Sequence, residues 1–204
     1  YKEDLSYLQS FLIIGEKDET RNEKAKMDLQ ILPEGGHLIE GIENSIGVKL
    51  LDEDGHGITF TNGELLNAKN EILTSFKSNQ FGLAKFKLKP VTNENYKISI
   101  TVSNDKIETK EIPQAKKEGL NLIVENQENS LLFSLTTSDT NYVANKTYYA
   151  AIHQAGKIKD FAFKFPQGVN TVDIKWKKDS LYPGVNTFTL LNETFEPLIE
   201  RQFF

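Results

Sequence analysis

Hydrophobic and polar residues alternate with a period of two along most of the chain. In residues 82–89, Ala84, Phe86 and Leu88 alternate with lysines. Strict alternation buries one face of a strand and leaves the other in water, which is typical of antiparallel sheets. The same pattern recurs in residues 46–50, 96–102, 120–124, 131–135, 161–165 and 172–176. It predicts an all-β protein of short antiparallel strands, without a convincing amphipathic helix.

Glycine-containing dipeptides separate several of these runs. Gly, Asn and Asp tolerate the positive φ that tight hairpins require, so these dipeptides predict turns between strands. Short strands at regular spacing, with such turns between them, favour β-sandwiches. The dipeptides are Asp54-Gly55, Asn62-Gly63, Ala155-Gly156, Gln167-Gly168 and Pro183-Gly184.

Two polar stretches divide the chain. Residues 113–119 combine Pro, Gly and charged residues, a composition that fits a short linker. Residues 16–26 are almost entirely charged or polar. We therefore expect a leader of residues 1–25, for which the last strand of a preceding domain is one interpretation. A first sandwich of residues 26–113 and a second of residues 118–204 would follow it.

The composition excludes several classes of protein. The 204 residues include 24 Lys and Arg and 29 Asp and Glu, and the formal charge of −5 argues against a nucleic-acid binder. Because cysteine is absent, disulfides, Cys-ligated zinc and thiol nucleophiles are excluded. No apolar run approaches the roughly 18–20 residues that span a bilayer, so we expect no transmembrane segment in this fragment. Since the sequence begins at Tyr1, we expect a mature protein or an excised piece.

The sequence lacks the motifs of common catalytic centres. The three histidines, His37, His56 and His153, form no pair at metal-binding spacing, and neither H-E-x-x-H nor G-x-S-x-G occurs. A hydrogen-bonded strand or surface histidine is the simpler interpretation of each. We therefore predict no enzymatic activity and no cofactor. A glycosidase would require paired carboxylates roughly 5–10 Å apart in a cleft.

One loop concentrates oxygen ligands. Residues 52–57 read DEDGHG, and calcium prefers several carboxylates with a glycine that tightens the loop. Asp52 and Asp54 are therefore weak calcium candidates. However, the twelfth position counted from Asp52, where an EF-hand has Glu, is Gly63. A hairpin turn explains the same loop without a metal.

Tyrosines are the candidates for ligand binding. Tyr148 and Tyr149 are adjacent, so one of them must point outward in a regular strand. Tyr142 and Tyr182 fall in expected loops. An exposed patch that includes some of these four rings would favour a glycan- or peptide-binding surface. Trp176 shares the parity of hydrophobic neighbours and is expected to face the core.

Three lysines of residues 82–89 form a stripe. Lys85, Lys87 and Lys89 should lie on one sheet face. A solvated face that discourages pairing between sheet edges is the simpler interpretation. An acidic partner or lipid headgroups are the functional alternative, which the overall negative charge weakens.

Four short segments share a recognisable pattern. Residues 29–41 read LQILPEGGHLIEG, residues 82–86 GLAKF, residues 184–191 GVNTFTLL and residues 197–204 PLIERQFF. They resemble the motifs F-P-E-G-G-x-L-v-x-G, G-M-G-x-F, G-i-n-x-f-T-L-f and P-L-x-E-R-x-v-F of macroglobulin-like (MG) domains in large Bacteroidetes envelope proteins. The resemblance extends over residues 27–204. Leu32 replaces the usual aromatic residue and Ala84 a glycine, departures that affect packing.

The resemblance implies a fold and a context. It implies two tandem antiparallel β-sandwich domains of immunoglobulin-like or macroglobulin-like type. It further implies a non-catalytic structural or interaction module of a larger envelope protein, in the periplasm, in the outer membrane or at the cell surface. Partners would be other domains of the same chain or envelope proteins, with a link to TonB-dependent receptors and outer-membrane transport. The thioester of complement-type macroglobulins needs a cysteine, which is absent. The alternative is a glycan- or peptide-binding module.

Overall fold

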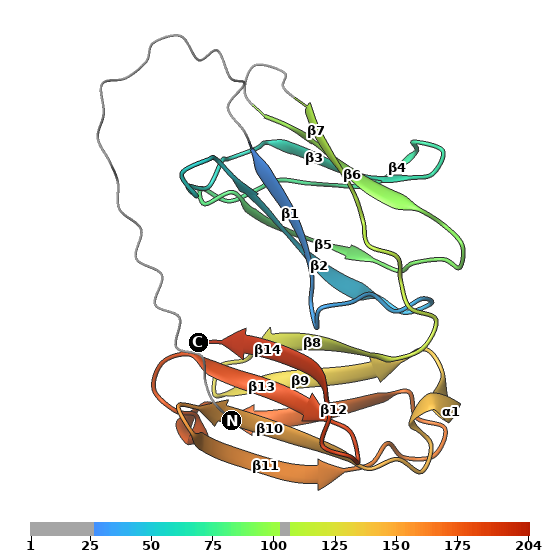
Figure 1. Ribbon diagram of the computed structural model, residues 1–204, viewed down its shortest axis with the longest axis vertical. Coiled ribbons are helices and arrows are strands. Elements are labelled where there is room, and N and C mark those ends of the chain that lie inside the picture. The colour runs from blue at the N-terminus through green and yellow to red at the C-terminus, as the bar shows by residue number, and fades with distance from the viewer. Residues whose placement is uncertain (1–26, 103–106) are drawn as a thin grey trace.

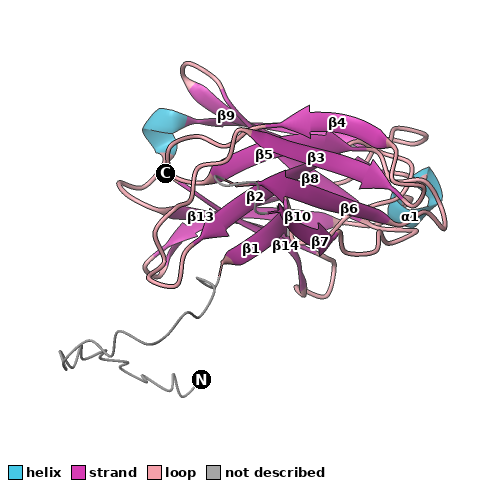
Figure 2. Ribbon diagram, turned by 90° about the horizontal axis from the view of Figure 1, so that it is seen from above, coloured by secondary structure: helices cyan, strands magenta, loops and turns pink. Residues whose placement is uncertain are grey.

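The computed structural model describes residues 27–102 and 107–204, shown from two sides in Figures 1 and 2. The leader expected at residues 1–25 lies outside the described residues. The described chain forms two all-β bodies, one above the other along the longest axis of Figure 1. The predicted fold class, two tandem antiparallel β-sandwiches, is confirmed. No helix within the described ranges is long and apolar enough to cross a bilayer.

The first sandwich packs a three-stranded sheet against a four-stranded one. Its strands are β1 (Asp28–Pro33), β2 (Asn44–Leu51), β3 (Asn62–Asn67), β4 (Ile72–Phe76), β5 (Leu83–Leu88), β6 (Tyr96–Thr101) and β7 (Ile107–Glu111). They pair antiparallel in the orders β1-β2-β5 and β4-β3-β6-β7. Alternate residues of β2 point between the sheets, so Ile46, Val48 and Leu50 are at most 1% exposed. In Figure 1 the sheet β1-β2-β5 lies nearer the second body.

Aromatic rings fill one side of the first core. Phe76 stacks on Phe86 with 4.9 Å between ring centroids and meets Phe60 edge-on at 6.0 Å. A Cβ at Gly63 would lie 2.5 Å from Cε2 of Phe76, so the glycine leaves room for that ring. Asn62-Gly63 accordingly lies inside β3, and the turn predicted there is wrong.

The second sandwich has the same two-layer plan. Its strands are β8 (Leu120–Asn126), β9 (Ser130–Thr137), β10 (Tyr148–Gln154), β11 (Lys157–Phe163), β12 (Thr171–Lys177), β13 (Asn186–Leu191) and β14 (Pro197–Phe203). They pair in the orders β12-β9-β8 and β11-β10-β13-β14. The turn between β10 and β11 is the predicted Ala155-Gly156, with positive φ at both residues. The structure also has two short helical turns, α1 (Thr140–Val143), which includes Tyr142 of an expected loop, and η2 (Lys178–Ser180) after β12.

The second core is built around stacked phenylalanines. Phe133 and Phe188 are fully buried, and their rings stack with centroids 4.4 Å apart and planes 15° apart. Trp176 packs against this core but is only partly buried. The first and second cores are separate clusters that share no member among the described residues. Each sandwich therefore buries its own apolar side chains.

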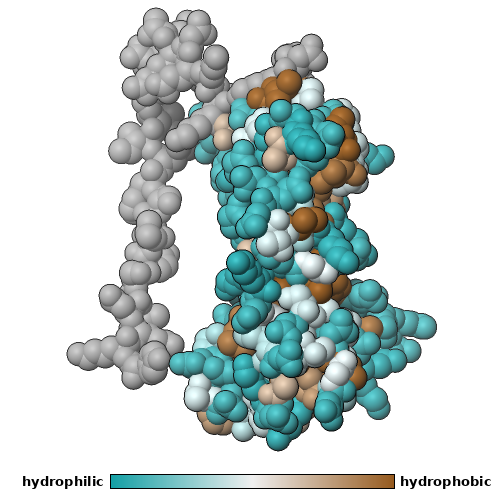
Figure 3. All heavy atoms as spheres, turned by 90° about the vertical axis from the view of Figure 1, so that its right-hand side faces the viewer, coloured by the Kyte–Doolittle hydropathy of each residue, from teal (hydrophilic) through white to brown (hydrophobic). Residues whose placement is uncertain are grey.

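Hydrophobic residues at the surface are dispersed on the side that Figure 3 shows. Hydrophilic residues cover most of this face, and hydrophobic ones form small groups over both bodies. Small groups of this kind are ordinary for a water-facing surface. On this face, therefore, no broad apolar area calls for a partner.

Replacement of Phe133 by alanine tests the second core. Because the ring is fully buried and stacked, Phe133→Ala should lower the free energy of unfolding by about 3–5 kcal/mol. Guanidinium denaturation followed by far-UV circular dichroism measures the change. Phe204→Ala is the control, because that side chain is 94% exposed and its loss should change little. Equal effects of the two substitutions would contradict the proposed packing.

Candidate functional site

The turn after β1 lies against the second sandwich. Gly35 and Gly36 have φ of +83° and +84°, a left-handed conformation that favours glycine. A Cβ at Gly35 would lie 3.6 Å from Cγ2 of Ile199 in β14 and 3.6 Å from the amide nitrogen of Leu122 in β8. The Pro-Glu-Gly-Gly segment therefore forms part of the contact between the two bodies.

Glu34 carries a buried carboxylate into this contact. Its side chain is 6% exposed. Oε2 lies 3.3 Å from Nζ of Lys85 in β5, and Oε1 lies 3.7 Å from Nε of Arg201 in β14. Burial of a carboxylate is costly unless cations or donors replace the lost water. Since Lys85 belongs to the first sandwich and Arg201 to the second, one carboxylate links both bodies.

Two hydrogen bonds join the two bodies in the same contact. Nε2 of His37 lies 3.0 Å from the carbonyl oxygen of Leu120, and Nδ2 of Asn121 donates to the carbonyl oxygen of Glu43 at 3.0 Å. Burial and the charge of Lys116 lower the pKa of His37, while the bond to the Leu120 carbonyl opposes them. The lowered pKa favours the neutral imidazole, and the tautomer that fits the carbonyl oxygen of Leu120 is the one whose Nε2–H donates to it.

The segment between the sandwiches is itself held in place. The amide of Lys116 donates to the carbonyl of Leu38 at 2.8 Å, and the amide of Glu40 donates to the carbonyl of Lys116 at 2.9 Å. The linker inferred from composition is thus hydrogen-bonded to the first sandwich. We use the word junction for five side chains. Four of them make the contacts between the two bodies, and the fifth, Lys85, pairs with Glu34 within the first sandwich. The five are Glu34, His37, Lys85, Asn121 and Arg201.

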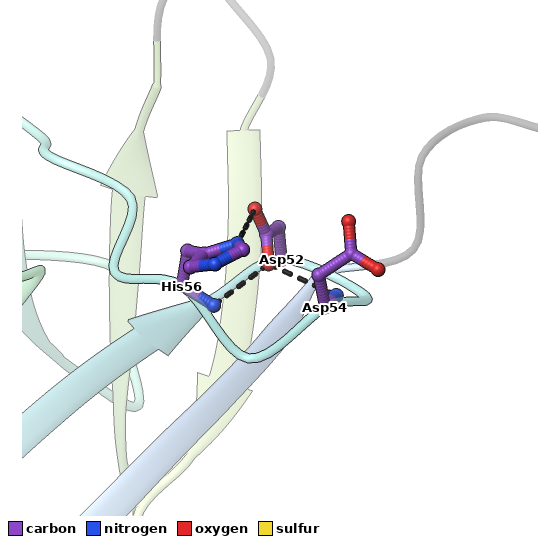
Figure 4. A group of neighbouring side chains, drawn as sticks. All are labelled: Asp52, Asp54 and His56. Atoms are coloured by element: carbon purple, nitrogen blue, oxygen red, sulfur yellow. Dashed lines mark hydrogen bonds and ion pairs between the residues drawn. The ribbon is translucent and has the colours of Figure 1, made fainter. Parts of the chain in front are cut away.

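The loop of the calcium hypothesis is shown in Figure 4. Oδ1 of Asp52 accepts the backbone N–H groups of Asp54 at 3.0 Å and His56 at 2.8 Å, while Oδ2 lies 3.5 Å from Nδ1 of His56. These interactions lower the pKa of Asp52, and the hydrogen bond from the backbone N–H of His56 has the largest effect. One ligand atom from each of the three side chains falls within 4.8 Å of the others. Because Asp52 already closes the turn, the loop is explained without a cation, and calcium at Asp52 and Asp54 stays a prediction.

Substitution of Asp52 tests this role in the turn. Asp52→Ala removes the acceptor, so the amides of Asp54 and His56 should exchange faster with deuterium. Asp52→Asn keeps a side-chain oxygen and should preserve most of the protection.

Because the folded-state pKa of Asp52 is lowered, its charge stabilises the fold above the unfolded pKa, and that stabilisation is lost as pH falls through the folded pKa. Unchanged exchange in Asp52→Ala, or an NMR titration of its carboxyl at or above 3.8, would contradict this account.

The four candidate tyrosines separate into two groups. Tyr142 and Tyr148 line a cavity of about 150 Å³, and Tyr149 stacks on Phe195 with 4.6 Å between ring centroids. Tyr182 lies near the other end of the β10–β11 hairpin, where the Nζ of Lys159 is 4.9 Å from its ring centroid.

Tyr148 is the inward-pointing member of the adjacent pair. Its side chain is 2% exposed, and burial raises its pKa to about 12, with the nearby Tyr142 and Glu193 adding to the shift. It therefore offers no ring face to a surface ligand. Tyr149 is the partly exposed residue of the two, so the alternation argument holds for this pair.

The lysine stripe of β5 has acidic partners within the chain. Lys85 faces Glu34, and Nζ of Lys87 lies 2.6 Å from Oε1 of Glu43. The bond to Glu43 raises the pKa of Lys87. These long-range partners, which sequence reasoning missed, compensate two charges of the stripe and weaken the case for an external acidic partner there.

Comparison with known proteins finds similarity in structure alone. No protein-family model and no curated protein matches this sequence. Dimeric latent PorU from Porphyromonas gingivalis is similar over 94% of this chain, with 11% identity and a TM-score of 0.44. The native conformation of Escherichia coli alpha-2-macroglobulin is similar over 89%, with 10% identity and a TM-score of 0.33. Domains 4–9 of the surface layer protein SbsC are similar over 87%, with 17% identity and a TM-score of 0.40.

In each case the similar stretch is part of a longer chain. This chain covers 21% of the PorU chain, 14% of the alpha-2-macroglobulin chain and 31% of the SbsC chain. Macroglobulin-like proteins are among these structural neighbours, at low sequence identity.

Proposed function

We propose that this chain is a non-catalytic spacer and interaction module of a larger bacterial cell-envelope protein. Its two domains, residues 26–113 and 118–204, would be held at one fixed orientation. The observation that carries the proposal is the junction, where the carboxylate of Glu34 lies between Lys85 and Arg201 from different sandwiches. A module of this kind sets the distance and direction between whatever precedes and follows it.

The junction supports a fixed orientation on geometric grounds. Contacts between domains of one chain are often small and polar, and relative motion is then the default. Here the ion pair of Glu34 with Arg201 and the hydrogen bonds of His37 and Asn121 involve different segments of the two bodies, and the two hydrogen bonds have defined directions. A rotation of one sandwich that preserves one of these bonds disturbs the others. The polar contact therefore favours a single arrangement.

The sequence motifs support the envelope context. Glu34 belongs to the P-E-G-G segment and Arg201 to the P-L-x-E-R segment, the two most specific parts of the resemblance to MG domains. These distant motifs meet at 3.7 Å in the junction. A location in the periplasm or at the outer membrane, and a link to TonB-dependent transport, are part of this proposal through that resemblance.

Loss of Glu34 tests the fixed orientation. In the unmodified chain, residual dipolar couplings from both sandwiches should fit one alignment tensor. Glu34→Ala removes both ion pairs, so the couplings should require two tensors and X-ray scattering should show a broader range of shapes. Glu53→Ala is the matched control, because Glu53 is exposed in the turn after β2, away from the junction. Two independent tensors already in the unmodified chain would refute the proposal.

Glycan binding is a second candidate, and one observation favours it. Phe195 is 62% exposed at the β13–β14 turn, where its ring stacks on Tyr149. Exposed aromatic faces of this kind suit the apolar face of a sugar ring.

A glycan array with the unmodified chain and with Phe195→Ala checks this candidate. If the stacked pair binds sugars, Phe195→Ala should weaken binding about tenfold, which corresponds to about 1.4 kcal/mol. Phe81→Ala, which removes a ring that is 61% exposed on the first sandwich, should leave binding unchanged. The absence of any binding at millimolar ligand would reject this candidate while leaving the spacer role intact.

A further inference from the structure

The free edge of β11 is the starting point. β11 pairs with β10 on one side and ends its sheet on the other. Six of its seven residues are exposed, and it lies at the end of the molecule farthest from the first sandwich in Figure 1. An edge strand presents backbone N–H and C=O groups along its free side, which another extended chain can pair with. β12 is the corresponding edge of the opposite sheet.

A shallow, open groove of about 350 Å³ lies between residues of these two edges. Phe161 of β11 and Trp176 of β12 form its apolar part, with ring centroids 5.7 Å apart. Phe161 is 40% exposed, and its ring also contacts Phe163, which packs against the second core. The groove is lined by Lys159, Phe161, Lys175, Trp176, Lys177 and Ser180. Apolar surface continuous with the core is therefore open to a ligand here.

The side chains that line the groove carry charge of a single sign, whereas Asp160 and Asp173 of the same two strands and Asp179 of η2 lie outside the lining. The lining includes Lys159, Lys175 and Lys177 and no carboxylate. Among the described residues, no Asp or Glu forms an ion pair with these three lysines, in contrast to Lys85 and Lys87 of β5. Nζ of Lys159 donates to the carbonyl of Ser180 instead. In a chain with a net charge of −5, three lysines without an ion pair, beside the exposed ring of Phe161 and the partly buried ring of Trp176, are complementary to an acidic ligand.

We propose that the groove between β11 and β12 binds an extended acidic peptide segment of a partner protein. The segment would pair with the free edge of β11, place apolar side chains on Phe161 and Trp176, and direct carboxylates toward Lys159, Lys175 and Lys177. A peptide is favoured over an acidic polysaccharide because its alternating N–H and C=O groups match the spacing of a strand edge. This inference goes beyond the spacer role and does not depend on it.

Trp176 provides the readout, because it is the sole tryptophan of the chain. An eight-residue peptide that repeats Glu-Thr-Val-Thr places glutamate and valine on one face of an extended chain. It should change the Trp176 fluorescence on titration, and higher salt should weaken its binding. Backbone amides of β11 should exchange more slowly in the complex, which marks strand pairing. The same peptide with lysine in place of glutamate should bind at least tenfold more weakly.

Charge reversal identifies the groove as the site. The double variant Lys159→Glu/Lys175→Glu should weaken binding of the acidic peptide at least tenfold, and Phe161→Ala should weaken it several-fold. Lys69→Glu changes the charge on the β3–β4 turn of the other sandwich and should leave binding unchanged. Far-UV circular dichroism and the unfolding midpoint show whether each variant keeps the fold.

Three results would overturn the proposal. The first is a Trp176 fluorescence that does not change up to millimolar acidic peptide. The lysines would then serve only to discourage pairing at the strand edge. The second is equal binding of the acidic and basic peptides. The third is binding of polygalacturonate with no binding of the peptide, which would make the groove a glycan site. None of these results bears on the junction, whose test is the dipolar couplings.

Discussion

The arrangement of this protein depends on a buried carboxylate between two cations. Each sandwich completes its own hydrophobic core, so neither needs the other to bury apolar side chains. What relates them is polar and directional. Glu34 is withdrawn from water at the end of β1, and its partners Lys85 and Arg201 come from both bodies. Because hydrophobic contact tolerates sliding and directional hydrogen bonds do not, the ion pair of Glu34 with Arg201 and the hydrogen bonds of His37 and Asn121 are the part that favours one orientation.

This view also explains why the recognisable motifs lie where they do. The P-E-G-G segment supplies the acid and two residues with positive φ, and the P-L-x-E-R segment supplies Arg201. A Cβ at Gly35 would make ordinary van der Waals contact with Ile199 and Leu122 at 3.6 Å, so the positive φ rather than the size of the residue favours glycine here. The motifs are about 165 positions apart in sequence and adjacent in space. Motif and geometry therefore describe the same contact between modules, rather than a chemical centre.

Alternation of residues predicted the layers well, because burial between two sheets imposes a period of two. Ile46, Val48 and Leu50 face the first core, and Phe133 faces the second, as the pattern requires. The failures concern contacts between distant segments. Gly63 resembled a turn residue, but it lies in a strand, where the absence of a side chain leaves room for the ring of Phe76. The ion pair of Arg201 and the hydrogen bonds of His37 and Asn121 depend on how the two bodies meet, which no local pattern encodes.

The two ends of the second sandwich use charge in opposite ways. At the junction, cations and a carboxylate are matched within the chain, so the contact is closed to outside ligands. At the β11–β12 edge, lysines that form no ion pair with a described residue flank the exposed ring of Phe161 and the partly buried ring of Trp176. Edge protection alone accounts for lysines, but it does not account for Phe161, because an exposed ring promotes the association that lysines oppose. A surface that repels most strands and attracts acidic ones is selective, and a rigid junction would present it at a defined distance from the first sandwich.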